Sequence, residues 1–275
     1  GYIKVIRNGG SDATIAPSMR VTLHGENGPV DGVFGHPAIH IKNRKKEATL
    51  DSIFIDVGAS SKEDVEKMGI QIGTVITFKD NFMKLGENYY TGRALDNRIG
   101  GVMIAEVARK LKEKGKKLPF KLYVVNSVQE EIGLRGAQMI ADTLKPNVAI
   151  ITDVCHETSS PCYTPSKQGE HIAGNGGVVT RAPAVHNILR KLILDTGDEK
   201  KIPYQLAASS RATGTDTDAF AFSNGGVPSA LISLPLKYMH TTCETVHKDD
   251  VKNVIKLIYQ TLLNIEENHN FKYNV

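Results

Sequence analysis

The stretch LYVVNSVQEEIGLRGAQMIADTLKPNVAIITDV, residues 122–154, decides the fold that we expect for this chain. Residues 122–128 and 148–154 are apolar runs that predict buried strands, and residues 135–144 between them predict a helix. A strand, a helix and a second strand in this order are typical of a mostly parallel sheet covered by helices. The stretch therefore predicts an α/β fold.

The same alternation continues on both sides of this stretch. An apolar helical stripe formed by Ile99, Val102, Met103, Val107 and Leu111 precedes it. A helix with Val185, Ile188, Leu189 and Leu192 on its apolar face follows, and after it come a strand at 227–234 and a last helix around 251–265. We expect residues 91–275 to form one α/β domain.

Residues 1–90 have a different pattern. Short strand-like runs at 2–6, 20–23 and 74–78 are separated by glycine-containing turns, which predicts a small β-rich lobe. One helix interrupts the lobe, because Ser60 and Glu63 have the spacing of a capping box and Gly69 ends the pattern. We expect this second, smaller domain to cover residues 1–90.

Composition excludes several classes of protein. With 40% hydrophobic and 23% charged residues the chain is too apolar to be disordered. The net charge is only +4, and the basic clusters at 42–46 and 112–117 contain no aromatic residues to stack on bases, so we expect no nucleic-acid partner. No apolar run reaches the length of a membrane helix, so we expect no membrane partner either.

Cys155, Cys162 and Cys243 are odd in number and lack the two-residue spacing of zinc or redox motifs. They are therefore expected to be unpaired thiols, which favours a reducing compartment. The expected location is the cytoplasm.

Charged side chains gather where the predicted strands end. Glu130 and Glu131 follow the first strand, Asp153 closes the next one, His240 follows the strand at 227–234, and Asp96 precedes the first long helix. Ligands collect beyond the carboxyl ends of the strands in such sheets, so these positions are expected to lie together. Taken singly, each has a simple explanation as a helix cap, a strand end or a solvated surface group.

Three carboxylates and one imidazole form a ligand set that suits zinc or a related divalent ion. Adjacent side chains on extended backbone point in opposite directions, so one of Glu130 and Glu131 can bind metal while the other faces the reacting water. Without metal the acids would repel one another, and bound cations reverse that effect. Two ions would polarise a scissile carbonyl and activate a water molecule whose proton a free carboxylate accepts.

The chain resembles the dinuclear metallo-aminopeptidases that include the tetrahedral dodecameric enzymes and glutamyl aminopeptidase, some members of which are labelled endoglucanases. The likeness covers nearly the whole chain and is carried by a set of short motifs. They are ALDNRIG at 94–100, VQEEIGLRGA at 128–137, TDV at 152–154, GTD at 214–216 and YMH at 238–240.

The resemblance implies a role for each site residue. Asp96 would bridge two ions, Glu131 and Asp153 would each bind one of them, His240 would complete the second site, and Glu130 would be the general base. The ions would be zinc, with cobalt as the alternative.

The resemblance also implies that the β-rich lobe is an inserted dimerisation domain, that the chain self-associates into dimers with a dodecamer as the larger assembly, and that peptides are the substrates. Family members carry a further metal-binding His, followed two residues later by Asp, upstream of the lobe. The sequence begins at Gly1 in mid-pattern. We therefore expect an N-terminal segment to be missing from this sequence.

The predicted function is metal-dependent removal of N-terminal residues from peptides. One alternative is an inactive metal-binding assembly protein. A second is a glycoside hydrolase that uses Glu130 with another carboxylate. Two opposed carboxylates would require neither His240 nor a third acid, and the chain has no Trp to stack on sugars, so this alternative is disfavoured.

Overall fold

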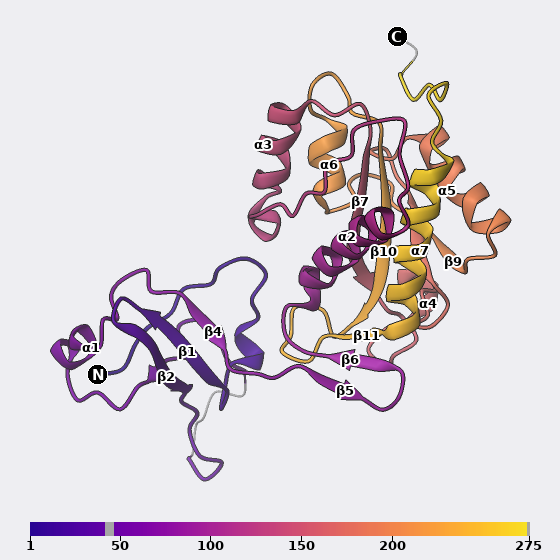
Figure 1. Cartoon of the computed structure of the whole chain (residues 1–275). Helices are drawn as coiled ribbons and strands as arrows, with labels where there is room; N and C mark the ends of the chain where they lie inside the picture. The colour runs from indigo at the N-terminus through magenta and orange to yellow at the C-terminus, as the bar shows by residue number, and fades with distance from the viewer. Residues whose placement is uncertain (42–46, 274–275) are drawn as a thin grey trace. The chain divides into compact units, whose positions relative to one another are not determined.

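The computed structural model describes residues 1–41 and 47–273, and the basic cluster at 42–46 lies outside them. The chain divides into two compact units (Figure 1). The first comprises Gly1–Phe82 with His240–Cys243, and the second comprises Met83–Met239 with Glu244–Val275.

The first unit contains a four-stranded antiparallel sheet in the order β3-β2-β1-β4. The strands are β1 (Arg20–Gly25), β2 (Gly28–Phe34), β3 (Ile55–Asp56) and β4 (Ile76–Phe78). The strands predicted at 20–23 and 74–78 are thus confirmed. The run at 2–6 contributes only a single bridge, between Ile3 and Ile55, because a strand pattern forms a ladder only where a partner extends beside it.

One helix, α1 (Lys62–Lys67), follows β3. Its N-cap is Ser61, whose hydroxyl accepts the Asp64 backbone N–H at 3.1 Å, so the predicted cap at Ser60 was wrong by one residue. The helix gives way to Gly69, whose φ of +79° favours glycine. The core beneath the sheet is formed by buried side chains such as Val21, Leu23 and Ile55.

The second unit contains a seven-stranded sheet in the order β5-β6-β11-β10-β8-β9, with β7 paired to β10. Its strands are β5 (Met83–Leu85), β6 (Tyr89–Thr91), β7 (Ala149–His156), β8 (Gly177–Arg181), β9 (Tyr204–Ala208), β10 (Ser229–Lys237) and β11 (Thr245–His247). The β7–β10 and β8–β9 pairs are parallel. The other pairs of this sheet in the described chain are antiparallel and shorter, so the sheet is mixed, with its two longest ladders parallel.

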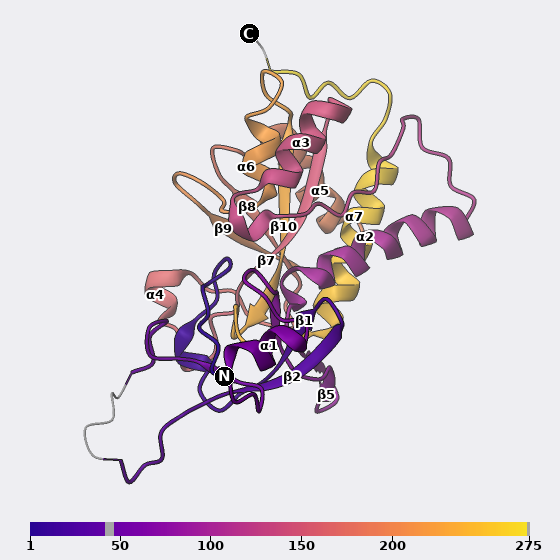
Figure 2. The ribbon, with the colours of Figure 1, turned by 90° about the vertical axis from the view of Figure 1, so that its left-hand side faces the viewer.

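Helices flank this sheet on both faces, which confirms the α/β class (Figures 1 and 2). Helices α5 (Asn187–Glu199) and α7 (Lys248–Asn264) pack together on one face, and α3 (Arg135–Leu144) packs with α6 (Asp216–Ala221) on the other. Helix α2 (Leu95–Glu113) contacts both α7 and β7. The short elements are η1 (Ala13–Ile15), η2 (Glu130–Ile132) and α4 (Pro165–Gln168).

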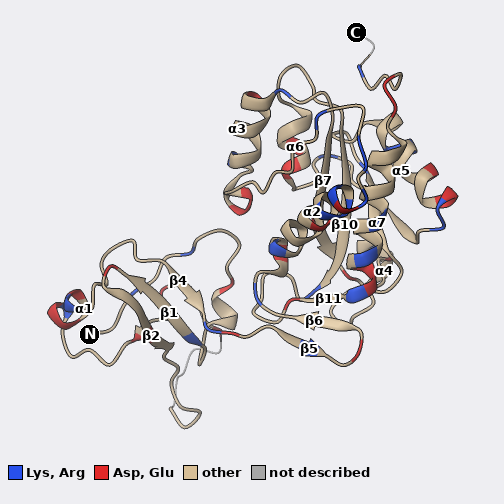
Figure 3. Ribbon diagram, viewed as in Figure 1, with Lys and Arg blue, Asp and Glu red and all other residues tan. Residues whose placement is uncertain are grey.

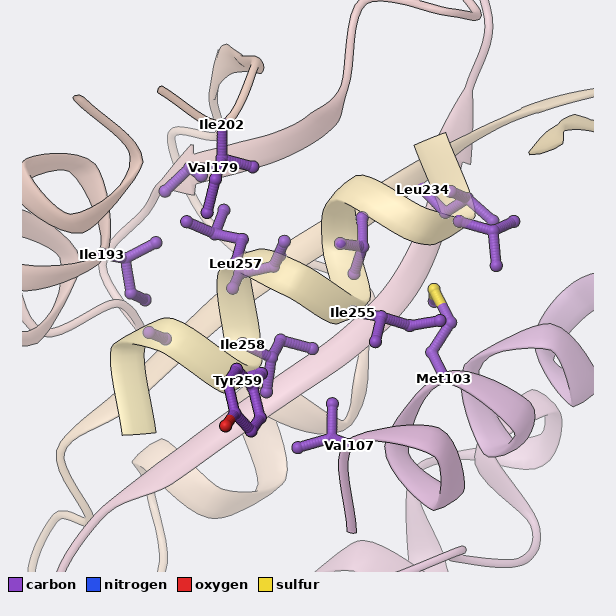
Figure 4. Close-up of a cluster of buried hydrophobic side chains, with 14 of the residues drawn as sticks. Met103, Val107, Val179, Ile193, Ile202, Leu234, Ile255, Leu257, Ile258 and Tyr259 are labelled. Carbon is purple, nitrogen blue, oxygen red and sulfur yellow. The ribbon is translucent and has the colours of Figure 1, made fainter. Parts of the chain in front are cut away.

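The core of the second unit lies between the sheet and helices α2, α5 and α7 (Figure 4). Met103 and Val107 of α2 face Ile255 and Ile258 of α7, as the helical spacing predicts. The apolar face predicted for the helix around 185–192 is only partly correct. Ile188 is 54% exposed, because α5 turns Leu189 and Ile193 inward instead.

The predicted buried strand at 122–128 is not observed. No ladder in the described residues includes this segment, and Val124 and Val128 are 47% and 66% exposed. An apolar run becomes a strand only when a neighbouring strand satisfies its backbone N–H and C=O groups. The sequence shows that residues 122–128 are apolar, but it does not show whether another strand lies beside them.

Acidic and basic side chains pair with one another on the surface of α2. On α2, Arg109 pairs with Glu106 at 2.6 Å and also with Glu113, so acidic and basic groups alternate on the helix that leads into 112–117 (Figure 3). No helix in the described ranges has the length and apolarity needed to cross a membrane. Cys155, Cys162 and Cys243 are free thiols, as predicted.

Candidate metal centre

Asp96 lies where the chain turns into α2. Ala94 at the N-cap has a left-handed φ of +52°, and Asp96 and Asn97 depart from helical backbone angles. The side chain of Arg98 reaches back across this turn, donating from Nε to the Ala94 carbonyl at 2.9 Å and from Nη2 to the Arg93 carbonyl at 2.7 Å. The ALDNR sequence thereby fixes the turn that presents Asp96.

Glu130 and Glu131 lie on the 3₁₀ turn η2. Its flanks are unusual, since Gln129 and Leu134 have positive φ values of +60° and +57°. The expectation of extended backbone was wrong here. A 3₁₀ turn has three residues per turn, so ideal geometry still separates consecutive side chains by about 120° around the axis.

His240 lies in the short loop between β10 and β11, with a positive φ of +61°. The loop is joined at both ends to the second unit, through Met239 and Glu244. One ligand atom from each of Asp96, Glu131 and His240 lies within 4.8 Å of the other two. Three of the predicted site residues, distant in sequence, therefore come together.

Asp153 lies outside this group of three, on β7, and is 7% exposed. The amide of Asn97 donates to the Asp153 Oδ1 at 3.0 Å and to the Thr152 carbonyl at 3.0 Å. The Val154 backbone N–H donates to the same oxygen at 2.8 Å. Asn97, the neighbour of Asp96, thus links the turn of α2 to Asp153.

The electrostatic surroundings of Asp153 disfavour its charge. The pKa of this carboxyl is raised to about 8, mainly by burial and in addition by the negative charges of Asp96, Glu130 and Asp216, against the opposing hydrogen bond from Val154. Several acids therefore act on one another around Asp153. A divalent cation among them would reverse this preference and favour ionised ligands.

Sequence reasoning missed two residues that hold the site. Asn97 was quoted only as part of a motif, although its place next to Asp96 was a usable signal. Glu244, which is 2% exposed, accepts the Asp96 backbone N–H at 3.0 Å through Oε2. Nothing in a single sequence connects residues this far apart, so the second contact required the fold.

Comparisons with known proteins identify the family of the chain. The model of the M42 glutamyl aminopeptidase family matches residues 1–257. The chain is 35% identical over 263 residues to the lysyl aminopeptidase of Pyrococcus furiosus, a match that covers 94% of this chain and 73% of the relative.

Peptidases are also found among the similar solved structures. Aminopeptidase APDkam598 from the archaeon Desulfurococcus kamchatkensis is similar with a TM-score of 0.88 and 31% identity, over 96% of this chain and 74% of the other. The TET1 peptidase of Pyrococcus horikoshii, described as assembling into a tetrahedron or a large octahedral shell, has a TM-score of 0.79 and 28% identity, over 92% and 74% of the two chains.

Proposed function

The chain belongs to the M42 glutamyl aminopeptidase family, and from this premise we propose that it is a dinuclear metal-dependent aminopeptidase that removes N-terminal residues from peptides. Zinc is the proposed metal and cobalt the alternative. The observation that carries the proposal is the convergence of Asp96, Glu131 and His240 ligand atoms to within 4.8 Å of one another.

The donor set fits such ions. Carboxylate oxygens and an imidazole nitrogen are the groups with which zinc sites that lack cysteine are built. Asp96 and His240 would hold the ions together with Glu131 and with Asp153, whose carboxylate Asn97 orients through a 3.0 Å hydrogen bond. When bound, two such ions supply polarisation of the scissile carbonyl and activation of a water molecule.

Glu130 would move the proton. It is the immediate neighbour of Glu131 on η2, where consecutive residues are about 120° apart around the axis, so one carboxylate would serve as ligand and the other would remain for acid–base work. We propose that the Glu130 carboxylate takes a proton from the attacking water and gives it to the nitrogen of the departing peptide. The Glu130 carbonyl accepts the backbone N–H groups of Gly133 and Leu134, both at 3.0 Å, which fixes the backbone from which the base projects.

We also propose self-association and a location. The likeness to a TET1 peptidase described as a tetrahedral or octahedral assembly supports oligomers built through the first unit, as dimers that can form a dodecamer. The three free thiols support a reducing, cytoplasmic environment.

The experiment that tests the function is hydrolysis of a panel of aminoacyl chromogenic substrates with added zinc or cobalt, with and without chelator. Chelator-sensitive release is expected, and Glu130→Gln is expected to lower turnover by about 10²- to 10⁴-fold while bound metal stays constant. Glu113→Gln, an exposed change at the end of α2, is the matched control and retains full activity.

Three outcomes would contradict the proposal. Full turnover by Glu130→Gln would remove its catalytic assignment. Silence on every peptide, with one firmly bound ion per chain, would favour the inactive assembly protein, and release of reducing ends from a glucan in excess chelator would favour the glycoside hydrolase.

A further inference from the structure

Glu244 is a buried acid that the proposed reaction leaves without a role. It immediately precedes β11, and only 2% of its surface is exposed. Its backbone carbonyl accepts the Gly92 N–H at 3.0 Å, and the neighbouring Thr245 hydroxyl lies 2.9 Å from that of Thr91. The backbone of Glu244 is therefore held firmly against the segment that leads into Asp96.

The side chain of Glu244 completes this connection. Its Oε2 accepts the backbone N–H of Asp96 at 3.0 Å. Backbone N–H groups in the first turn of a helix have no partner within the helix, and a carboxylate is a strong acceptor for such a group. Asp96, with φ −73° and ψ 110°, is outside helical geometry, so its orientation depends on contacts of this kind.

We propose that Glu244 is a positioning residue for metal binding: it holds the backbone of Asp96 so that the Asp96 carboxylate meets Glu131 and His240. This inference rests on the proposed metal-dependent function. Residues that orient metal ligands through hydrogen bonds commonly change metal affinity by about 10- to 100-fold when they are replaced. Glu244 would orient Asp96 by a hydrogen bond to the Asp96 backbone and not to the Asp96 side chain.

Two substitutions separate the hydrogen bond from other effects of the side chain. Glu244→Gln keeps an acceptor oxygen of nearly the same shape and removes the charge, whereas Glu244→Met fills similar space without an acceptor. We expect cobalt affinity to fall about 10- to 100-fold in the Met variant and to remain within about fivefold of the wild type in the Gln variant.

The matched control is Glu157, which is also fully buried and whose carboxylate accepts the Ser159 and Ser160 backbone N–H groups at 3.2 Å. Glu157→Met removes a buried acceptor and should therefore lower the free energy of unfolding. It should not change the cobalt affinity of the folded protein. A general loss of folding is thereby distinguished from a specific loss of metal positioning.

The experiment measures cobalt binding by competition with a chromophoric chelator, the cobalt absorption spectrum, and amide hydrogen exchange at Asp96 in metal-free protein. Faster exchange at Asp96 in the Met variant, but not in the Gln variant, reports the hydrogen bond independently of activity.

Unchanged cobalt affinity in Glu244→Met, or an equal loss in both variants, would overturn the role of Glu244. Absence of cobalt binding by the wild type would instead overturn the proposed function, and the role of Glu244 with it.

Discussion

Two buried aspartates of the second unit, Asp250 and Asp153, have opposite surroundings. Asp250, at the start of α7, is fully buried and accepts the Gly174 and Gly176 backbone N–H groups, each at 2.7 Å. Burial raises the pKa of Asp250, but those N–H groups and His247 oppose the rise. Burial also raises the pKa of Asp153, and three neighbouring acids add to the rise against one backbone hydrogen bond, from Val154.

The difference separates structural acids from candidate ligands. Two backbone N–H groups offset the cost of burying the Asp250 carboxylate. Their hydrogen bonds join the 174–176 loop to α7. The region of Asp153 gathers further negative charge, although the Asn97 amide and the Val154 backbone N–H both donate to the carboxylate. A cluster of this kind is stable when a cation supplies the missing positive charge.

The largest effect is expected from Asp153→Asn, which replaces the proposed anionic ligand with a neutral amide. Residues that only orient ligands already contribute about 10- to 100-fold to metal affinity, so losing a ligand is expected to cost at least about 100-fold in peptide hydrolysis. Initial rates and cobalt titration measure both quantities, with exposed Asp142→Asn on α3 as the control. If Asp153→Asn bound metal as tightly as the wild type, Asp153 would be a structural acid like Asp250 and not a metal ligand.

Asp250→Ala tests the other side of the comparison. It leaves the Gly174 and Gly176 N–H groups without their acceptor, at a cost of about 2 to 5 kcal/mol in the free energy of unfolding. Urea unfolding measures this loss. Asp250→Asn retains one acceptor oxygen, so its free energy of unfolding should lie between those of the wild type and Asp250→Ala. Metal affinity of the folded variant should equal that of the wild type, and a large drop would mean that Asp250 also belongs to the site.

Asn97→Ala sharpens the comparison by removing the side-chain amide that donates to Asp153. Its amide bonds both the Asp153 carboxylate and the Thr152 carbonyl, so we expect metal affinity to fall about 10- to 100-fold with a smaller change in stability. Competition with a chelator provides the measurement. A larger stability loss than that of Asp250→Ala, with intact metal affinity, would reverse this assignment.

The smallest effect is expected at an exposed pair. Lys191 and Asp195 on α5 form an ion pair at 2.6 Å, with both side chains more than half exposed. Asp195→Asn should change the free energy of unfolding by less than about 0.5 kcal/mol, because surface pairs are solvated and screened. A change comparable to that of Asp250→Ala in the same urea titration would remove the distinction between buried and exposed carboxylates.

Sequence reasoning succeeded where a periodic pattern is long. The stripe of α2 at Met103 and Val107, and that of α7 at Ile255 and Ile258, form the core as predicted, because burial of a helical face needs only spacing. The run at 122–128 shows the limit, since strand formation depends on a partner that a local pattern does not contain.

The candidate site divides in the same way. Asp96, Glu131 and His240 could be singled out by residue type and position after strands, and the fold brings them together. The roles of all five residues, Glu130 and Asp153 included, remain predictions. The hydrogen bonds of Asn97 and Glu244 could not be predicted, since they depend on the left-handed turn before α2 and on a loop far away in sequence.

The contact between Asp96 and Glu244 spans 148 positions of the chain. Closing a loop of that length is slow and entropically costly, so this contact forms only when most of the second unit has folded. A cation that requires Asp96 in its native orientation consequently binds the folded chain and not the unfolded one. By mass action, free metal at 100 times its dissociation constant would stabilise the protein by about 2.7 kcal/mol, and the metal content of the surroundings would become a thermodynamic control on how much of the chain is folded.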